Sequence, residues 1–312
     1  MEQISERELQ TAVKPSPHFD WAGSLSFLSE SGANDDLDHI ADGVLTRPIR
    51  LAGRVARLRV ASAAEAGLLV TLRAPDGEEA PSEAMMHAAL DHLKRRFYLD
   101  VDMETVRKAL AVDAYGEELV GRFWPSRPVN YADAWHALLK SVVHSQIYPG
   151  FAAQLDRYLR ETYGTAVAFE GETVHLFPTP QQLASADEVT LQEAKFSRQK
   201  SKYVVDISRT LLTEAEKYDF EALREGDGQA AVETLADLYG VGPWISQNVA
   251  MRGLPHPDVF IDEKATRATI KDAYATGPRF GKKAVQQAVE SFAPYRSFAC
   301  YYTYMKHYNT DR

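Results

Sequence analysis

The sequence predicts an α+β fold, with a mixed N-terminal domain over about residues 1–105 and a helical body over 106–312. In the first part of the chain apolar residues alternate with polar ones, which is typical of strands. Beyond about residue 105 they recur every three to four positions, which is typical of amphipathic helices. The apolar share of 45% is enough for a hydrophobic core in a chain of 312 residues.

The N-terminal domain is predicted to contain two strands and a helix. The first fifteen or so residues are expected to form a loose leader, followed by a short apolar segment at 19–28. Apolar residues alternate through Leu51–Val60 and through Leu68–Leu72, with a turn expected near Ala64–Gly67. The segment Met85–Phe97 has the apolar spacing of a helix.

The body is predicted to consist of helices. Thr179 or Pro180 begins one of them, because proline suits the first helical turn. The expected helices are Tyr131–His144, Phe151–Thr162, Pro180–Ala186, Arg198–Glu214, Gly228–Tyr239, Pro243–Arg252, Lys264–Ala275, Gly281–Phe292 and Ser297–Tyr308.

Composition restricts the class of protein. The single cysteine, Cys300, excludes an intrachain disulfide, a four-cysteine cluster and a cysteine-based zinc site, and we expect a reducing cytoplasm. There is no apolar run of about 18 residues, so no membrane span is expected. The net charge of −9 argues mildly against nucleic acid. However, residues 192–312 hold 17 Lys and Arg against 16 Asp and Glu, so this part can still present a local basic face.

The segment ETLADLYGVGPWISQNVAMRG, at 233–253, is the most informative in the chain. Its pattern predicts two helices joined by Gly240-Val241-Gly242, with Pro243 in the first turn of the second helix. The two glycines permit positive φ and the close approach of a ligand. The free N–H groups and the helix dipole would bind an anion such as a DNA phosphate. The pattern also fits an ordinary connection between helices, and in either case Val241 is expected to pack into the core.

A carboxylate follows the second helix, in LPHPDVFIDEKATRATI. We interpret Asp258–Ile261 as a short buried extended piece, after which Asp262 and Glu263 begin a helix. A lone aspartate at such a position commonly caps the helix. Held beside a flipped nucleotide, it would instead stabilise positive charge on the sugar and accept a proton from the attacking water.

These residues resemble a known motif. The hairpin Leu238–Trp244, followed by Asp262 at 18 residues from Trp244, is similar to the helix-hairpin-helix, Gly/Pro-rich, aspartate motif of DNA glycosylases, with the spacing of the endonuclease III branch. Other segments resemble the 3-methyladenine DNA glycosylase II family, namely PHFDWAGSLSFL, HALLKSVVHSQIY, LFPTPQQLASAD, AMRG and PYRSFACYYTY. The resemblance covers roughly residues 17–308.

The resemblance implies an α+β N-terminal domain followed by a two-lobed all-helical glycosylase body, with the helix-hairpin-helix at about 231–253 and the site in the cleft. It implies a monofunctional DNA glycosylase that excises alkylated purines of the 3-methyladenine type by base flipping and hydrolysis of the N-glycosidic bond. The expected partner is duplex DNA containing damaged bases, with no membrane and no obligate protein partner indicated. We expect a cytoplasmic monomer, nucleoid-associated in a bacterium.

The resemblance also assigns roles to residues. No cofactor is required, and a structural Na⁺ or K⁺ held by carbonyls of the hairpin is typical of these folds. The implied site consists of the catalytic Asp262, the base-pocket residues Phe27, Trp244, Tyr304 and Asn248, the DNA wedge Ile147 with Gln146 beside it, the phosphate-binding hairpin Gly240, Val241 and Gly242, and the cation-binding carbonyls of Leu238 and Val241.

Each role has an ordinary alternative. By itself Ile147 is more often a core residue, and Trp244 and Tyr304 more often pack between helices. Phe27 can simply join the N-terminal domain to the body, and we interpret His144 as structural.

Several positions depart from the pattern. Bifunctional relatives have a lysine where Trp244 stands, so we expect hydrolysis that leaves an abasic site, with Lys264 only a distant alternative nucleophile. The branch often has an aromatic residue where this chain has Asn248, so the pocket is expected to be more open or more polar. Asp262 is preferred to Glu263 because its spacing to the hairpin and to Arg267 follows the endonuclease III pattern.

Other functions remain open at this point. One is a glycosylase for oxidised or deaminated bases. Another is a non-catalytic helix-hairpin-helix DNA-binding protein, and a third is a helical protein unrelated to DNA, in which the glycines only make a turn.

Overall fold

A computed structural model of the chain describes residues 7–30, 37–274 and 282–308. The chain divides into two compact units. Unit 1 comprises residues 1–100 and 143–209, and unit 2 comprises residues 101–142 and 210–312. The chain passes between them within helices α5 (Ala134–His144) and α9 (Arg198–Thr213).

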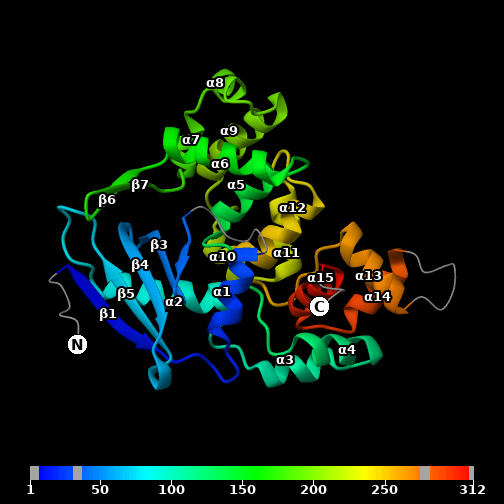
Figure 1. Cartoon of the computed structure of the whole chain (residues 1–312). Coiled ribbons are helices and arrows are strands. Elements are labelled where there is room, and N and C mark those ends of the chain that lie inside the picture. Colours follow the sequence, from blue (N-terminus) through cyan, green and yellow to red (C-terminus); the bar gives the residue numbers. More distant parts are fainter. Residues whose placement is uncertain (1–6, 31–36, 275–281, 309–312) are drawn as a thin grey trace. The chain divides into compact units, whose positions relative to one another are not determined.

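Unit 1 is built on a five-stranded antiparallel sheet with the strand order β1-β5-β4-β3-β2 (Figure 1). Apolar residues alternate along β4, so Leu58 and Val60 pair with Leu72 and Val70 of β5, and all four are fully buried. The strands are β1 (Glu8–Val13), β2 (His39–Ala41), β3 (Val44–Leu51), β4 (Arg54–Ser62) and β5 (Leu68–Arg73).

Two sequence predictions about this sheet were wrong. The expected leader includes strand β1, which pairs with β5 along its whole length, a contact between segments some sixty residues apart. The expected single strand through Leu51–Val60 is two strands, because Ala52 and Gly53 take φ values of 47° and 78° and reverse the chain. The turn near Ala64–Gly67 is confirmed, as a 3₁₀ turn at Ala64–Ala66.

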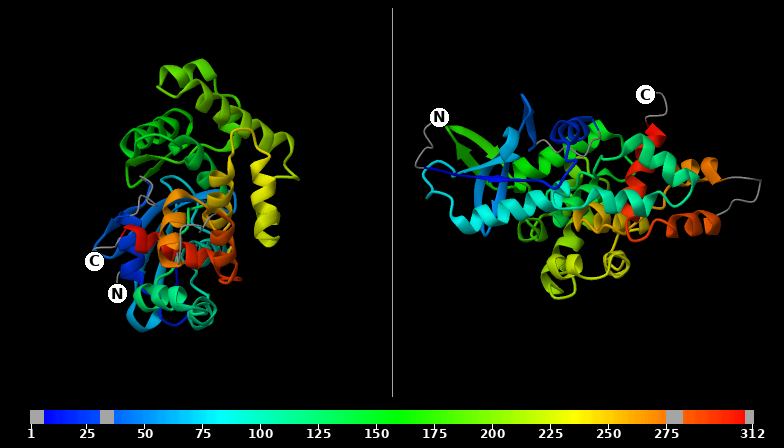
Figure 2. Two further views of the ribbon diagram at one scale, coloured as in Figure 1. Left: turned by 90° about the vertical axis from the view of Figure 1, so that its right-hand side faces the viewer. Right: turned by 90° about the horizontal axis from the view of Figure 1, so that it is seen from below.

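The N-terminal part of unit 1 also contains two helices, α1 and α2. Helix α2 (Glu83–Phe97) confirms the predicted helix and packs on the sheet, contacting β1 and β3 (Figures 1 and 2). Its N-terminus is capped by Ser82, whose hydroxyl accepts the Met85 N–H. The expected apolar segment at 19–28 lies largely in helix α1 (Trp21–Glu30), and the Trp21 ring meets the Phe97 ring edge-on at 5.3 Å.

A buried ionic cluster joins the sheet to α2. The Asp38 carboxylate accepts from Arg47 Nη1 at 2.8 Å and from Arg96 Nη1 at 2.9 Å, and Arg96 Nη2 also contacts it. The side chains of all three are at most 4% exposed. Removing the carboxylate would leave two cations buried, which is strongly unfavourable.

The second part of unit 1 is mostly helical. Its elements are α6 (Pro149–Tyr163), β6 (Ala166–Phe169), β7 (Glu172–His175), α7 (Pro180–Ala184), α8 (Glu188–Glu193) and most of α9. The turn between β6 and β7 is tied to the loop after β5, since the N–H groups of Glu170 and Gly171 donate to the Asp76 carboxylate at 3.0 and 2.8 Å. These bonds hold the pKa of Asp76 below its ordinary value.

Unit 2 is helical over its described residues. Its centre contains Tyr115 of α4, whose ring packs edge-on against Tyr274 of α13 and Phe292 after α14. The elements are α3 (Met103–Leu110), α4 (Ala114–Phe123), most of α5, α10 (Phe220–Glu225), α11 (Gly228–Ala236), α12 (Pro243–Asn248) continued by a π-helical turn (Val249–Gly253), α13 (Lys264–Tyr274), α14 (Lys282–Glu290) and α15 (Arg296–Tyr308).

The fold class predicted from the sequence is confirmed, with differences in detail. The predicted all-helical body also contains the β6–β7 hairpin and the short helices α3, α4, α8 and α10, which were not predicted. Residues 143–209 group with the N-terminal sheet, whereas the sequence suggested one boundary near residue 105. Ala275 and Gly281, at ends of expected helices, lie outside the described residues.

Within the described ranges, no helix combines the length and the apolar character needed to cross a membrane.

Candidate functional site

The hairpin of unit 2 links α11 to α12 through residues 237–242. Gly240 has φ +90°, a conformation that favours glycine, and the Val241 N–H donates to the Leu238 carbonyl at 2.9 Å. Val241 is buried, as predicted. Gly242 does not share the positive φ expected of both glycines, since its φ is −87°, and a Cβ there would meet open space. Gly240 is thus needed for the turn itself, while Gly242 leaves the surface uncovered.

Helix α12 begins at Pro243, as predicted, and its far end is fixed by packing. Gly253, the glycine of AMRG, lies against α5, where a Cβ would come within 2.7 Å of the Ala137 Cβ. The Asn248 amide donates to the Ser141 hydroxyl of α5 at 2.9 Å, and Asn248 is only 3% exposed. Asn248 therefore connects two helices in the interior, and its place in the base pocket stays a prediction.

Asp262 lies just before α13. Its N–H donates to Gln247 Oε1 of α12 at 3.0 Å, and its Oδ1 lies 2.9 Å from Arg267 Nε. The preceding segment carries no strand, but Val259 and Ile261 are buried and anchor it in the core. Gln247 thus fixes the backbone of Asp262 and Arg267 pairs with its carboxylate, while the Asp262 side chain, 24% exposed, still reaches the surface.

Glu263 makes different contacts from those of Asp262. Its Oε2 accepts a hydrogen bond from Trp244 Nε1 at 2.6 Å. After burial and the neighbouring Cys300, Glu263 also raises the pKa of the Tyr304 phenol, which places this phenol near the carboxylate. Trp244 is 38% exposed, and Tyr304 is half-buried on α15. The structure therefore brings two of the three aromatic residues predicted for the base pocket, Trp244 and Tyr304, near one carboxylate, that of the residue after Asp262.

The predicted wedge lies in unit 1, in the turn between α5 and α6. Gln146 is exposed, with φ +56°, and Ile147 is half-exposed. Lys200 of α9 clamps the start of this turn, because its Nζ donates to the Ser145 carbonyl at 2.6 Å and also to the Val143 carbonyl. Burial lowers the pKa of Lys200.

A second contact supports the same turn. His144 Nε2 lies 2.5 Å from Asp156 Oδ2 of α6. Tyr148, directly after the wedge, is 78% exposed. An exposed aromatic ring next to Ile147 is suited to stack on a nucleotide base.

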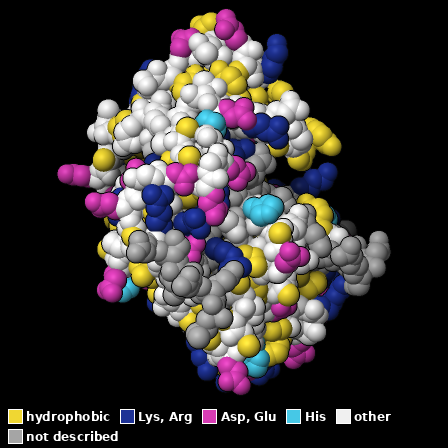
Figure 3. Space-filling view, turned by 60° about the vertical axis from the view of Figure 1, so that its left-hand side comes forward, with side chains coloured by type: hydrophobic (Ala, Val, Ile, Leu, Met, Phe, Trp, Pro, Cys, Tyr) yellow, Lys and Arg dark blue, Asp and Glu magenta, His cyan; other side chains and the backbone are white. Residues whose placement is uncertain are grey.

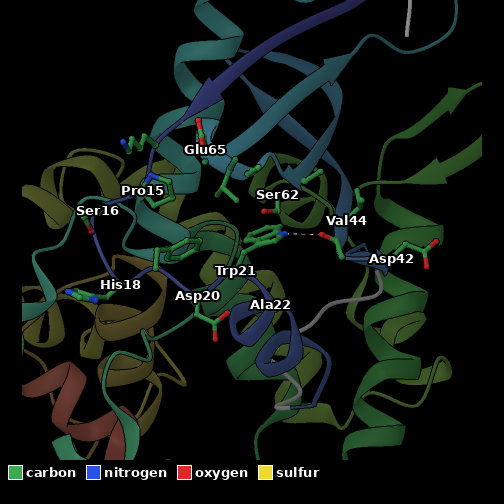
Figure 4. A pocket seen from close by; sticks show the side chains of 17 residues that line it. Pro15, Ser16, His18, Asp20, Trp21, Ala22, Asp42, Val44, Ser62 and Glu65 are labelled. Atoms are coloured by element: carbon green, nitrogen blue, oxygen red, sulfur yellow. Dashed lines mark hydrogen bonds between the residues drawn. The ribbon is translucent and has the colours of Figure 1, made fainter. Parts of the chain in front are cut away.

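Phe27 is half-buried on α1 in unit 1. The same unit contains a hollow of about 700 Å³ beside the N-terminus of α1, but Phe27 does not line it. Figure 4 shows the Trp21 ring inside this hollow, with its Nε1 donating to the Gly43 carbonyl at 2.9 Å. The hollow is thus distinct from the predicted base pocket.

Charged side chains of both signs are mixed on the surface. On the face shown in Figure 3, Lys and Arg side chains alternate with Asp and Glu side chains and do not gather into one large basic field.

A family model described as "HhH-GPD superfamily base excision DNA repair protein" matches residues 139–294, which are 156 of the 312 residues. The chain belongs to this HhH-GPD superfamily. The matched region contains the predicted wedge, the hairpin and Asp262, whereas Phe27 and Tyr304 lie outside it.

The superfamily membership agrees with similarity to individual proteins. The chain is 23% identical to "DNA-3-methyladenine glycosylase" of Bacillus subtilis over 286 residues, covering 91% of this chain and 92% of the relative. It is 24% identical to "DNA-3-methyladenine glycosylase 2" of Escherichia coli over 288 residues, covering 91% and 92%. A solved "3-methyladenine dna-glycosylase from Archaeoglobus fulgidus" shares its fold, with a TM-score of 0.75, 21% identity and coverage of 97% and 99%.

Some residues of this HhH-GPD protein were missed by the sequence analysis. The exposed Tyr148 and Tyr239 were not singled out, although they flank the wedge and the hairpin and are 78% and 59% exposed. Their positions in the sequence, next to these motifs, could have pointed to both tyrosines. The roles of Lys200 and of Glu263 had no such signal, because they depend on contacts between segments distant in the chain.

Proposed function

We propose that this protein is a monofunctional DNA glycosylase that removes alkylated purines of the 3-methyladenine type from duplex DNA. One observation carries the proposal: the Gln247 side chain of the hairpin's second helix accepts the Asp262 N–H, so the backbone that bears a partly exposed carboxylate is tied to the hairpin. The superfamily of base excision repair proteins and the two relatives named DNA-3-methyladenine glycosylases support it.

Asp262 would act on the sugar. As the N-glycosidic bond breaks, its electron pair leaves with the base, and positive charge develops on the sugar ring. A fixed carboxylate stabilises that charge and accepts a proton from the water that adds its hydroxyl to the sugar carbon. The ion pair with Arg267 at 2.9 Å orients the carboxylate for this role.

The absence of an amine at the Trp244 position accounts for the monofunctional chemistry. A lyase reaction needs a nitrogen nucleophile to form a Schiff base with the sugar, and the indole of Trp244 is not one. Lys264 is exposed at the start of α13 and remains a distant alternative. The product is therefore an abasic site in an intact strand.

The hairpin and the wedge would hold the DNA. Gly242 leaves open space at the start of α12, which would let a backbone phosphate approach the N–H groups there. Ile147 would fill the space that the flipped base leaves, and flipping requires a few kcal/mol.

A monovalent cation is a further part of the proposal. Its ligands would be the carbonyls of Leu238 and Val241. The Leu238 oxygen accepts one hydrogen bond, from the Val241 N–H, and a carbonyl oxygen has two lone pairs, so a second remains for a cation. Carbonyl oxygens are common ligands of Na⁺ and K⁺. The bound ion would reinforce the positive potential of the hairpin toward phosphate.

The test is the identity of the product. Duplexes that contain 7-methylguanine, hypoxanthine or 8-oxoguanine are incubated with the protein, and released bases are separated from the strands. We expect release of the methylated base and strand breakage only after alkali. Release of 8-oxoguanine or hypoxanthine alone would instead support the alternative of an oxidised or deaminated base. Binding without release would support the non-catalytic alternative.

A further inference from the structure

Glu263 lies where two aromatic side chains of unit 2 meet. Trp244 comes from the first turn of α12, and Tyr304 comes from α15, sixty residues further along the chain. The Trp244 indole donates to the Glu263 carboxylate at 2.6 Å, and the Tyr304 phenol lies near enough to this carboxylate to feel its charge. One side chain therefore orients the Trp244 ring and lies beside the Tyr304 ring.

The backbone of Glu263 is itself fixed. Its N–H contacts the Thr266 hydroxyl at 3.2 Å and the Ile261 carbonyl at 3.1 Å, and its carbonyl accepts from Arg267 Nε at 3.2 Å. Thr266 is fully buried. The first turn of α13 thus holds Glu263 in place, and the position of the carboxylate does not depend on the aromatic partners alone.

The two aromatic side chains keep their protons beside this carboxylate. Burial, then the neighbouring Cys300, then Glu263 raise the pKa of Tyr304 well above its ordinary value, so the phenol stays protonated. The indole N–H can only donate, and a carboxylate oxygen accepts.

The charge has a consequence for any ligand that stacks on these rings. An aromatic face attracts cations because of its quadrupole, and an N–H or O–H that donates to an anion places further negative charge beside the ring. A purine nucleoside methylated at N3 or N7 carries a formal positive charge. Hypoxanthine and ethenoadenine are neutral, so they gain nothing from that charge.

We propose that Glu263 is a specificity-determining residue: it orients Trp244 and supplies, beside Trp244 and Tyr304, a negative charge that makes the site favour cationic alkylated purines over neutral damaged purines. This inference rests on the function proposed above. It also separates the two adjacent carboxylates, because Asp262 would act on the sugar and Glu263 would act on the base.

Three variants and the wild type test it. Glu263→Gln keeps the shape and removes the charge, Glu263→Asp keeps the charge and shortens the side chain, and Glu117→Gln removes an equal charge from an exposed position on α4. Single-turnover release is measured from duplexes with 7-methylguanine and with hypoxanthine, and thermal unfolding checks that each variant is folded.

We expect Glu263→Gln to release 7-methylguanine about tenfold more slowly, with release of hypoxanthine unchanged. Glu263→Asp should retain most of the preference, and Glu117→Gln should behave as wild type. Equal losses on both substrates, equal losses in Glu263→Gln and Glu263→Asp, or no change at all would overturn the proposal. If wild type releases no methylated base, the proposed function itself fails, which is a separate result.

Discussion

The Lys200 clamp on the wedge turn permits a quantitative prediction for Lys200→Met, which keeps the length and removes the ammonium group. Its Nζ donates to two carbonyls at the C-terminus of α5, Ser145 at 2.6 Å and Val143. Hydrogen bonds to charged groups contribute about 1.5–3 kcal/mol each. The Lys200→Met variant no longer has to bury an ammonium group, which offsets part of the lost hydrogen-bond energy. The net loss of stability in the clamped turn is therefore about 1–3 kcal/mol.

The clamped turn contains a strained residue. Gln146 has φ +56°, a left-handed conformation that is unfavourable by about 1–2 kcal/mol outside glycine. The free energy of the strain at Gln146 is therefore similar to the free energy that the Lys200 clamp contributes. Without Lys200, the turn should leave its present conformation much of the time. Since about 1.4 kcal/mol corresponds to a factor of ten, we expect about tenfold slower single-turnover excision.

The assay compares Lys200→Met with Lys202→Met on the same helix. Lys202 pairs with Asp206 at 2.6 Å, and its side chain is 48% exposed, so its loss should change excision less than twofold. A lesion placed opposite a mismatched base flips more easily, and the Lys200→Met defect should shrink there. If folded Lys200→Met protein excises as fast as wild type, or if the defect is the same with the mismatch, the clamp does not support the wedge.

Three further predictions concern stability and binding. Asp38→Asn leaves two buried guanidinium groups without their carboxylate and should lower the free energy of unfolding by about 3–5 kcal/mol in urea titrations; a loss below about 1 kcal/mol would contradict the cluster's role. Burial lowers the pKa of His256 despite its contact with the Leu223 carbonyl, so the unfolded chain takes up a proton first as the pH falls below about 6.5. Stability should therefore decrease below that pH, and less so in His256→Asn; identical pH profiles would refute this. Gly240→Ala should destabilise by about 1–2 kcal/mol because of its φ of +90°. Gly242→Ala should keep its stability and weaken duplex binding, and the reverse pattern would contradict the hairpin assignment.

Local patterns were the reliable part of the sequence analysis. The hairpin, the Pro243 helix start and the helix at Met85–Phe97 follow from turn residues and apolar spacing, which act over a few positions. Strand β1 was missed because it is a short edge strand whose half-buried face has only Leu9 and Val13 as large apolar residues, and its partner β5 lies far along the chain. Such pairings are properties of the fold and leave little trace in a short segment.

In the candidate site, too, local spacing was predictable from the sequence and contacts between distant segments were not. Asp262 was identified through its spacing to the hairpin, and the structure adds the contacts with Gln247 and Arg267 that hold it. Asn248 was expected in the pocket because of its position, yet it bonds to Ser141 of another helix. The position of a residue in the sequence predicts which face of a helix it occupies. It does not predict which distant side chain forms a hydrogen bond with it.

The most direct measurement of the central claim is base release by Asp262→Asn. Wild-type and variant proteins are given one duplex that contains 7-methylguanine, with binding and single-turnover release measured separately. We predict that the variant binds with nearly unchanged affinity and releases the base about 10²–10⁴-fold more slowly, while wild type leaves an intact strand with an abasic site. Full activity in Asp262→Asn would contradict the account, because the carboxylate would then serve only the structure of α13.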